Sequence, residues 1–150
     1  MSEARQFCTF FLDRLFFGVE VQRVQEVLRY QEMTRVPLAS SGVSGLINLR
    51  GQIVTAIDLR RRLGLQERPA DQLPMNVIVR TGDGAVSLLV DEIEDVLEVT
   101  EDDFEHLPGT ISDVARDLIH GVYKFKDRLL FMLDTEKTVD LGAINSRTQE

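Results

Sequence analysis

The stretch that organises this chain is residues 43–60, VSGLINLRGQIVTAIDLR. It holds two apolar runs, and the polar residues Asn48, Arg50 and Gly51 lie at the bend between them. Apolar packing explains the two runs, because β-branched residues fit a pleated, half-buried surface. Packing does not explain the arginine. Arg50 is either a solvated turn residue or a residue placed for a partner.

Short apolar runs separated by turn residues recur along the chain, and they predict three hairpins. The turns of these hairpins fall at residues 13–14, 81–84 and 126–128. The second turn, Thr-Gly-Asp-Gly, gives the strongest signal because glycine accepts the backbone angles of tight turns. Hairpins at this spacing favour a barrel or sandwich over alternating βαβ units. The predicted fold is therefore mainly β, with barrels and short helices.

Three segments predict short helices. Asp58 and Asp134 are each suited to cap a helix, over residues 59–63 and 135–141 respectively. Residues 21–27 carry valines at helical spacing with polar residues between them, which predicts a third helix after the second strand. The polar segment 66–74, bounded by prolines, is predicted to be a flexible break that joins two halves of one fold.

Length, composition and charge restrict the class of protein. A chain of 150 residues with 43% hydrophobic content suits one domain with a real core. A net charge of −8 argues against nucleic-acid binding. No apolar stretch approaches the roughly 20 residues of a membrane span, and no secretory signal is recognisable, so we expect a cytosolic domain without membrane insertion. The single cysteine, Cys8, forms no internal disulfide, and no metal site or cofactor motif is expected.

Two charged clusters stand out. Residues 91–105 hold nine acidic residues. The apolar residues among them predict one buried and one solvated face, and these are Ile93, Val96, Leu97 and Val99. Steering toward a basic partner is the alternative role of the acidic residues. The basic cluster at residues 60–62 is predicted to be a solvated helix end, with contact to an acidic partner surface as its alternative.

Several motifs, taken in order, resemble the CheW family, the coupling proteins of bacterial chemotaxis. They are GVEV at 18–21, VQEV at 24–27, GLINLRGQIV at 45–54, IDLR at 57–60, VDEIEDVL at 90–97 and DRLL at 127–130. The resemblance extends from about residue 6 to residue 139. Apolar hairpins are common in β proteins, so the order of the motifs around the central NLRG carries the match.

The resemblance implies a fold and a function. The family fold is two small five-stranded β-barrels packed side by side, so we expect one CheW-like domain of two subdomains at 6–141, with flexible tails at 1–5 and 142–150. The family members are adaptors and not enzymes. They bind the cytoplasmic tip of chemoreceptors and the CheW-like regulatory domain of the histidine kinase CheA. Such a protein is cytoplasmic, is recruited to membrane-associated receptor arrays, and needs no cofactor.

The resemblance also implies a receptor-binding groove between the two barrels. Arg50 and Glu26 match an arginine and a glutamate of that groove, and an arginine fork suits a carboxylate. Val24, Val27 and Ile93 match apolar groove positions. The plainer interpretations are a purely structural ion pair and ordinary core residues.

The resemblance also indicates where the kinase binds and where this chain departs from the family pattern. The family binds the kinase through one end of the first barrel, which here is expected to include parts of residues 7–21 and 53–57. Ser87 and Glu92 stand where the family has glycines, so the receptor preference stays open.

Two alternative functions also stay open. One is an adaptor of a related pathway, such as type IV pilus motility or surface sensing, because such adaptors share the fold. The other is a small β-barrel enzyme. It lacks support, because His106 and His120 have no acidic or cysteine partner at catalytic spacing.

Overall fold

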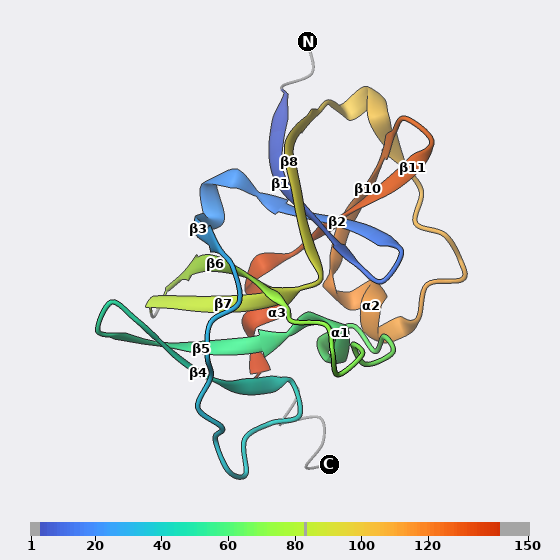
Figure 1. The fold of residues 1–150 in the computed structure, drawn as a ribbon. Helices are drawn as coiled ribbons and strands as arrows, with labels where there is room; N and C mark the ends of the chain where they lie inside the picture. Colours follow the sequence, from blue (N-terminus) through green and yellow to red (C-terminus); the bar gives the residue numbers. More distant parts are fainter. Residues whose placement is uncertain (1–3, 83, 142–150) are drawn as a thin grey trace.

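The computed structural model describes residues 4–82 and 84–141, and they form two β-sheets with short helices (Figure 1). Sheet A has the order β8-β1-β2-β11-β10-β9, and sheet B has the order β3-β6-β7-β5-β4. The predicted mainly β class with two side-by-side units is confirmed. The units differ in detail from five-stranded barrels: sheet A has six strands, and neither hydrogen-bonded order closes into a ring.

The strands of sheet A come from both ends of the chain. They are β1 (Arg5–Leu12), β2 (Leu15–Glu20), β8 (Glu92–Val99), β9 (Phe104–Glu105), β10 (Ile119–Phe125) and β11 (Arg128–Leu133). The strands of sheet B come from the middle. They are β3 (Val24–Leu28), β4 (Val43–Leu49), β5 (Gln52–Asp58), β6 (Met75–Thr81) and β7 (Gly84–Val90). All three predicted hairpins are present, as β1–β2, β6–β7 and β10–β11.

The chain passes from sheet A to sheet B after β2 and returns to sheet A after β7. The predicted link at residues 66–74 is therefore wrong, because that segment connects helix α1 (Leu59–Arg62) to β6 and both belong to the sheet B half. The structure begins sheet A at Arg5, within the expected N-terminal tail, and residues 142–150 lie outside the described residues.

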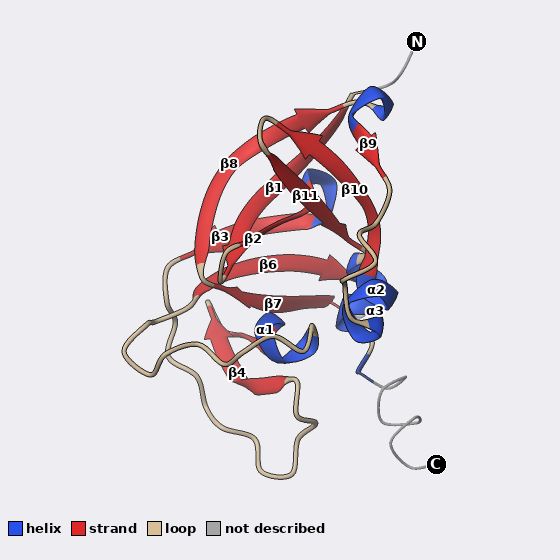
Figure 2. Cartoon of the chain, turned by 90° about the vertical axis from the view of Figure 1, so that its right-hand side faces the viewer, coloured by secondary structure: helices blue, strands red, loops and turns tan. Residues whose placement is uncertain are grey.

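The main core lies where the two sheets face each other. Phe10 and Phe17 of sheet A share one buried cluster with Val77 and Leu88 of sheet B. Figure 2 shows the strands of sheet A above those of sheet B, with α2 (Asp113–Leu118) and α3 (Thr135–Val139) together at one side. Burial of the apolar side chains of this cluster is the main force that holds the two sheets together.

Both predicted caps are present, although α1 ends at Arg62 and α3 at Val139, one and two residues before the predicted ends. In α1, an Asp58 carboxylate oxygen accepts a hydrogen bond from the Arg60 amide at 3.0 Å, and in α3 the Asp134 carboxylate accepts one from the Lys137 amide at 3.1 Å. Both contacts satisfy a backbone donor that the first helical turn leaves free. Helix α2, which begins after the Ser112 cap, was not predicted.

The predicted helix at residues 21–27 is wrong. Only Val21–Arg23 are helical, as the 3₁₀ helix η1, and Val24–Leu28 then form β3, the edge strand that pairs with β6. Valine spacing fits both structures over so short a segment, and β-branched side chains favour the strand once a partner strand is available.

Gly45→Ala is expected to destabilise the fold. A Cβ at Gly45 would lie 2.7 Å from the carbonyl oxygen of Thr34, which forms a backbone bridge with Leu46 and cannot move freely. We expect a loss of about 1–3 kcal/mol of unfolding free energy, as for other overpacked sites, measured by urea denaturation. Gly82→Ala is the matched control, because no atom of the described residues beyond its chain neighbours lies within 4 Å of a Cβ at that position. Equal stability of the two variants would contradict the prediction.

Candidate functional site

The β4–β5 hairpin presents Arg50 at its tip. Leu49 pairs with Gln52, so Arg50 and Gly51 alone form the turn, with φ values of +52° and +88°. Two successive positive φ angles are those of a type I′ turn, which matches the twist of the strands. The Asn48 side chain accepts a hydrogen bond from the Gly51 amide at 2.9 Å and supports the turn. Glycine suits this conformation better than arginine, but Asp13 and Lys126 of two other hairpin turns also have a positive φ, so the backbone alone does not single out Arg50.

Arg50 and Glu26 form the predicted ion pair. An Arg50 Nη2 hydrogen donates to Glu26 Oε2, and the side-chain Nε2 of Gln25 donates to the same oxygen at 3.3 Å. The Arg50 side chain is 66% exposed and the Glu26 side chain 24% exposed. The hydrogen bond from Arg50, assisted by the one from Gln25, lowers the pKa of Glu26, and the same contact raises the pKa of Arg50. The pair is therefore ionised at neutral pH and accessible from solvent.

The Glu26 carboxyl is expected to titrate below the ordinary glutamate range. Its charged form accepts a hydrogen bond from a cation, which favours ionisation. In the Arg50→Ala variant the Glu26 pKa should rise toward its ordinary value, because the first cause of its depression is gone. Carboxyl-detected NMR titration of both proteins measures this. An unchanged Glu26 midpoint would mean that the two side chains are not paired in solution.

The three apolar candidates are not gathered in one place. Exposure alternates along β3, so Val24 and Glu26 are partly buried whereas Val27 is 43% exposed. Ile93 lies in β8, opposite Phe10 of β1. Val24 and Ile93 both pack against the core cluster between the sheets, one from sheet B and one from sheet A. The structure thus brings Arg50 and Glu26 together and places Val24 and Ile93 where the sheets join.

A buried charge network centred on Asp91 was not predicted. Asp91 follows β7, and its carboxylate accepts hydrogen bonds from Arg60 Nε at 3.0 Å and from Arg68 Nε at 2.8 Å. The Asp13 amide of the β1–β2 turn donates to the same carboxylate at 2.6 Å. A buried carboxylate needs such partners, so one sign would have been the acidic residue directly after the apolar run of β7.

The basic cluster at residues 60–62 is not a solvated helix end. Arg60 is buried against Asp91, and Arg62 is buried as well. Arg62 Nε donates to the Thr138 carbonyl at 2.8 Å and Arg62 Nη2 to the Lys137 carbonyl at 2.7 Å, which ties α1 to the end of α3. Only Arg61 is substantially exposed, and it pairs with Glu67. The prediction failed because a short arginine run gives no sign of which members find buried acceptors.

The acidic segment presents a largely solvated surface. Ile93 and Leu97 are partly buried and Val99 is buried, whereas Val96 lies on the exposed face with the acidic residues and does not belong to the buried set as predicted. Strand β8 is an edge strand of sheet A. Charged side chains on an edge strand discourage pairing with other chains, which agrees with the solvated role.

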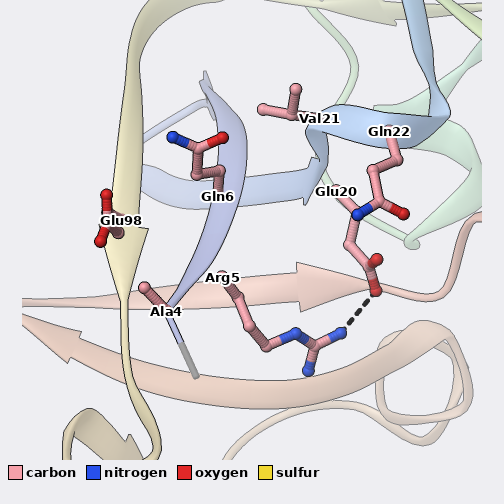
Figure 3. Close-up of a pocket in the computed structure, with 7 residues that line it drawn as sticks. All are labelled: Ala4, Arg5, Gln6, Glu20, Val21, Gln22 and Glu98. Carbon is pink, nitrogen blue, oxygen red and sulfur yellow. Dashed lines mark hydrogen bonds and ion pairs between the residues drawn. The ribbon is translucent and has the colours of Figure 1, made fainter. Parts of the chain in front are cut away.

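A hollow lies at the end of sheet A where the chain leaves for sheet B. Figure 3 shows the residues that line it, which are Ala4, Arg5, Gln6, Glu20, Val21, Gln22 and Glu98. Two of these lining residues form an ion pair, in which Arg5 Nη2 contacts Glu20 Oε1. The hollow includes the end of the early-strand region expected to meet the kinase. Ile53, from the other expected region, is a solvent-exposed residue of β5.

The described residues also show whether this part of the chain holds a membrane-spanning helix, a metal site or a reactive cysteine. Among residues 4–82 and 84–141, no helix is long and apolar enough to cross a membrane. In the same part of the chain, no three His, Cys, Asp or Glu side chains converge as ligands for a metal ion. Cys8 is partly buried in β1, and burial raises the pKa of its thiol.

This chain is similar to known proteins both in sequence and in structure. A CheW-like domain model matches residues 6–142. The chemotaxis protein CheW of Treponema pallidum is 30% identical over 140 residues, which covers 91% of this chain and 82% of that protein. The crystal structure of the scaffolding protein TtCheW from Thermoanaerobacter tengcongensis superposes with a TM-score of 0.77 at 25% identity, covering 88% of this chain and 90% of that one. A weaker match, 28% over 108 residues, is the protein PilI of Pseudomonas aeruginosa, covering 72% of this chain and 61% of PilI.

Proposed function

This chain belongs to the CheW family of chemotaxis scaffold proteins, and from that premise we propose that it couples the cytoplasmic tip of a chemoreceptor to the regulatory domain of the histidine kinase CheA. It acts by binding and needs no catalytic group. It is a single domain of two subdomains, works in the cytoplasm, and joins membrane-associated receptor arrays through these two partners.

The Arg50–Glu26 ion pair is the main support for the proposed receptor-binding site. Arg50 lies at the tip of the β4–β5 hairpin, reaches Glu26 of β3 and remains largely exposed while it does so. An exposed ion pair adds little to stability, so stability alone does not account for this arrangement. The guanidinium has further N–H donors beside the one used by Glu26, and these suit acceptors on a receptor helix.

The apolar part of the receptor site is provided by Val24, Val27 and Ile93. Two of them reach the junction of the sheets and the third is exposed on β3. A few apolar anchors beside a polar pair are the usual composition of a groove that binds an amphipathic helix. The kinase would then use a separate surface, for which the hollow between Arg5, Glu20 and Glu98 is the candidate.

The test is a pair of titrations with the purified chain. One uses a soluble receptor fragment that contains the cytoplasmic tip, and the other uses the regulatory domain of CheA. We expect saturable binding to each and a ternary complex when all three are mixed, seen by size-exclusion chromatography. Absence of binding to both partners would refute the coupling function.

The match to PilI favours one second candidate, an adaptor in a pilus-motility pathway. The same titrations with the receptor and kinase of a pilus system separate the two. Preferential binding to the pilus partners would move this chain to that pathway and leave its adaptor role unchanged.

A further inference from the structure

Arginine side chains hold both crossovers between the two sheets. At the first crossover, Arg80 Nη1 of β6 donates to the carbonyl oxygens of Gln22 and Val24, each at 3.1 Å. At the second, Arg60 and Arg68 hold Asp91, the residue between β7 and β8. These contacts lie where the chain changes sheet, so they bear on how one sheet is oriented against the other.

Asp91 is bonded from both sheets at once. From sheet A, the Asp13 amide donates to its carboxylate at 2.6 Å, and the Phe11 carbonyl accepts from its amide at 3.0 Å. From the sheet B half come the guanidinium groups of Arg60 in α1 and of Arg68 in the segment before β6. The side chains of Arg60, Arg68 and Asp91 are 6%, 7% and 5% exposed. The network is therefore a buried junction between the sheets.

The network adds little net stability, because its charged groups lose their hydration when they are buried. Arg68 Nη1 lies 3.6 Å from Asp58 Oδ2, and Arg68 Nη2 is buried without a hydrogen-bond partner among the described residues. Removing several charges from water costs about as much as their pairing returns, and apolar residues often serve as well. Directional bonds do provide one thing that apolar contact does not, a fixed geometry between the parts they join.

We propose that Arg68 and Arg60, acting through Asp91, set the angle between sheets A and B and so position the two sides of the partner-binding groove. They are positioning residues and do not touch the partner. The consequence for binding rests on the proposed function, in which one partner contacts residues of both sheets. The consequence for sheet orientation does not depend on it.

The first experiment measures the orientation without any partner. In a Cys8→Ala background, spin labels at Val96→Cys on β8 and Ile53→Cys on β5 report the distance between the sheets by pulsed electron resonance, since both positions are exposed. We expect Arg68→Met to shift or broaden the distance distribution. Arg61→Met, a neighbouring exposed arginine that pairs with Glu67, should leave it unchanged. An unchanged distribution in a folded Arg68→Met variant overturns the proposal.

The second experiment measures binding of the unlabelled variants to the receptor fragment. Arg68→Met should weaken binding by about 2- to 30-fold, the range of coupling effects from residues outside a site. Arg68→Lys should recover part of the distance distribution and of the affinity, because it keeps the charge but not the fork. If the methionine variant does not fold, Arg68→Lys is compared with the parent chain in both experiments, and a distance distribution identical to the parent's then overturns the proposal. A shifted distribution with unchanged receptor affinity would refute the positioning role and leave only the structural one. If the parent chain fails to bind the receptor, the proposed function fails and the label experiment still decides the orientation.

Discussion

Asp91→Asn is expected to lower the unfolding free energy by about 3–5 kcal/mol, the cost of breaking a buried ion pair from one side. The substitution keeps the size of the side chain but removes its charge. Arg60 and Arg68 then remain buried without the carboxylate that compensates them. Urea denaturation at neutral pH, followed by circular dichroism, gives the two free energies.

Asp95→Asn is the matched control for this experiment. Asp95 lies on the same segment of the chain with its side chain in solvent, so its loss should change stability by no more than about 0.5 kcal/mol. Adding Arg68→Met to Asp91→Asn should restore part of the loss, because one of the two stranded charges is removed. A loss below about 1 kcal/mol for Asp91→Asn alone would show that the network does not hold the crossover.

The same carboxylate predicts how the fold responds to acid. Burial raises the pKa of Asp91, but the hydrogen bonds from Arg60, from the Asp13 amide and from Arg68 outweigh it, and the pKa lies below its ordinary value. A lowered pKa in the folded state adds stability that is fully present above the unfolded value. That stability is lost as the pH falls through the folded value. The contribution of Asp91 is therefore constant through the neutral range, falls as the pH drops below the ordinary aspartate pKa, and is gone once the pH is below the lowered pKa of the folded state.

Structural features that depend on adjacent residues could be predicted from the sequence, whereas features that depend on distant residues could not. The hairpin turns at residues 13–14, 81–84 and 126–128 were predictable because a turn is specified by adjacent residues. Residues 21–27 were misassigned because the edge of β6, which makes Val24–Leu28 a strand, lies far along the chain. The partners of Asp91 could not be predicted for the same reason, since Asp91 and Asp13 are 78 positions apart.

The candidate site also depends on contacts between residues that are far apart in the sequence. The pairing of Arg50 with Glu26 came from family resemblance, because neither spacing nor periodicity joins a strand residue to a turn 24 positions later. The resemblance named Val24, Val27 and Ile93 together, but it did not show that they face different ways. Their exposure depends on the bulge in β3 and on the register between β8 and β1, which are set by tertiary pairing.

Arg50→Glu is expected to reduce receptor binding by about tenfold or more, as loss of a central interface arginine commonly does. The change places two carboxylates side by side at the hairpin tip and removes every N–H donor that the guanidinium offers. Titration of the receptor fragment measures the loss, and circular dichroism checks the fold. Arg50→Gly controls for the turn, because glycine adopts its positive φ without strain, so this variant should fold at least as well and still bind weakly.

The charge swap Glu26→Arg with Arg50→Glu separates the two roles that Arg50 can have. The swap re-forms an ion pair between the same positions, so it should restore binding if the pair only shapes the groove. Arg50 is much the more exposed of the two side chains, and Glu26 occupies only Nη2 of its guanidinium. We therefore expect the swapped protein to fold like the parent and yet bind the receptor as weakly as Arg50→Glu, because its exposed position now carries a carboxylate that cannot donate. Recovery of parental affinity by the swap would show that the ion pair, and not a direct contact from Arg50, is what the receptor requires.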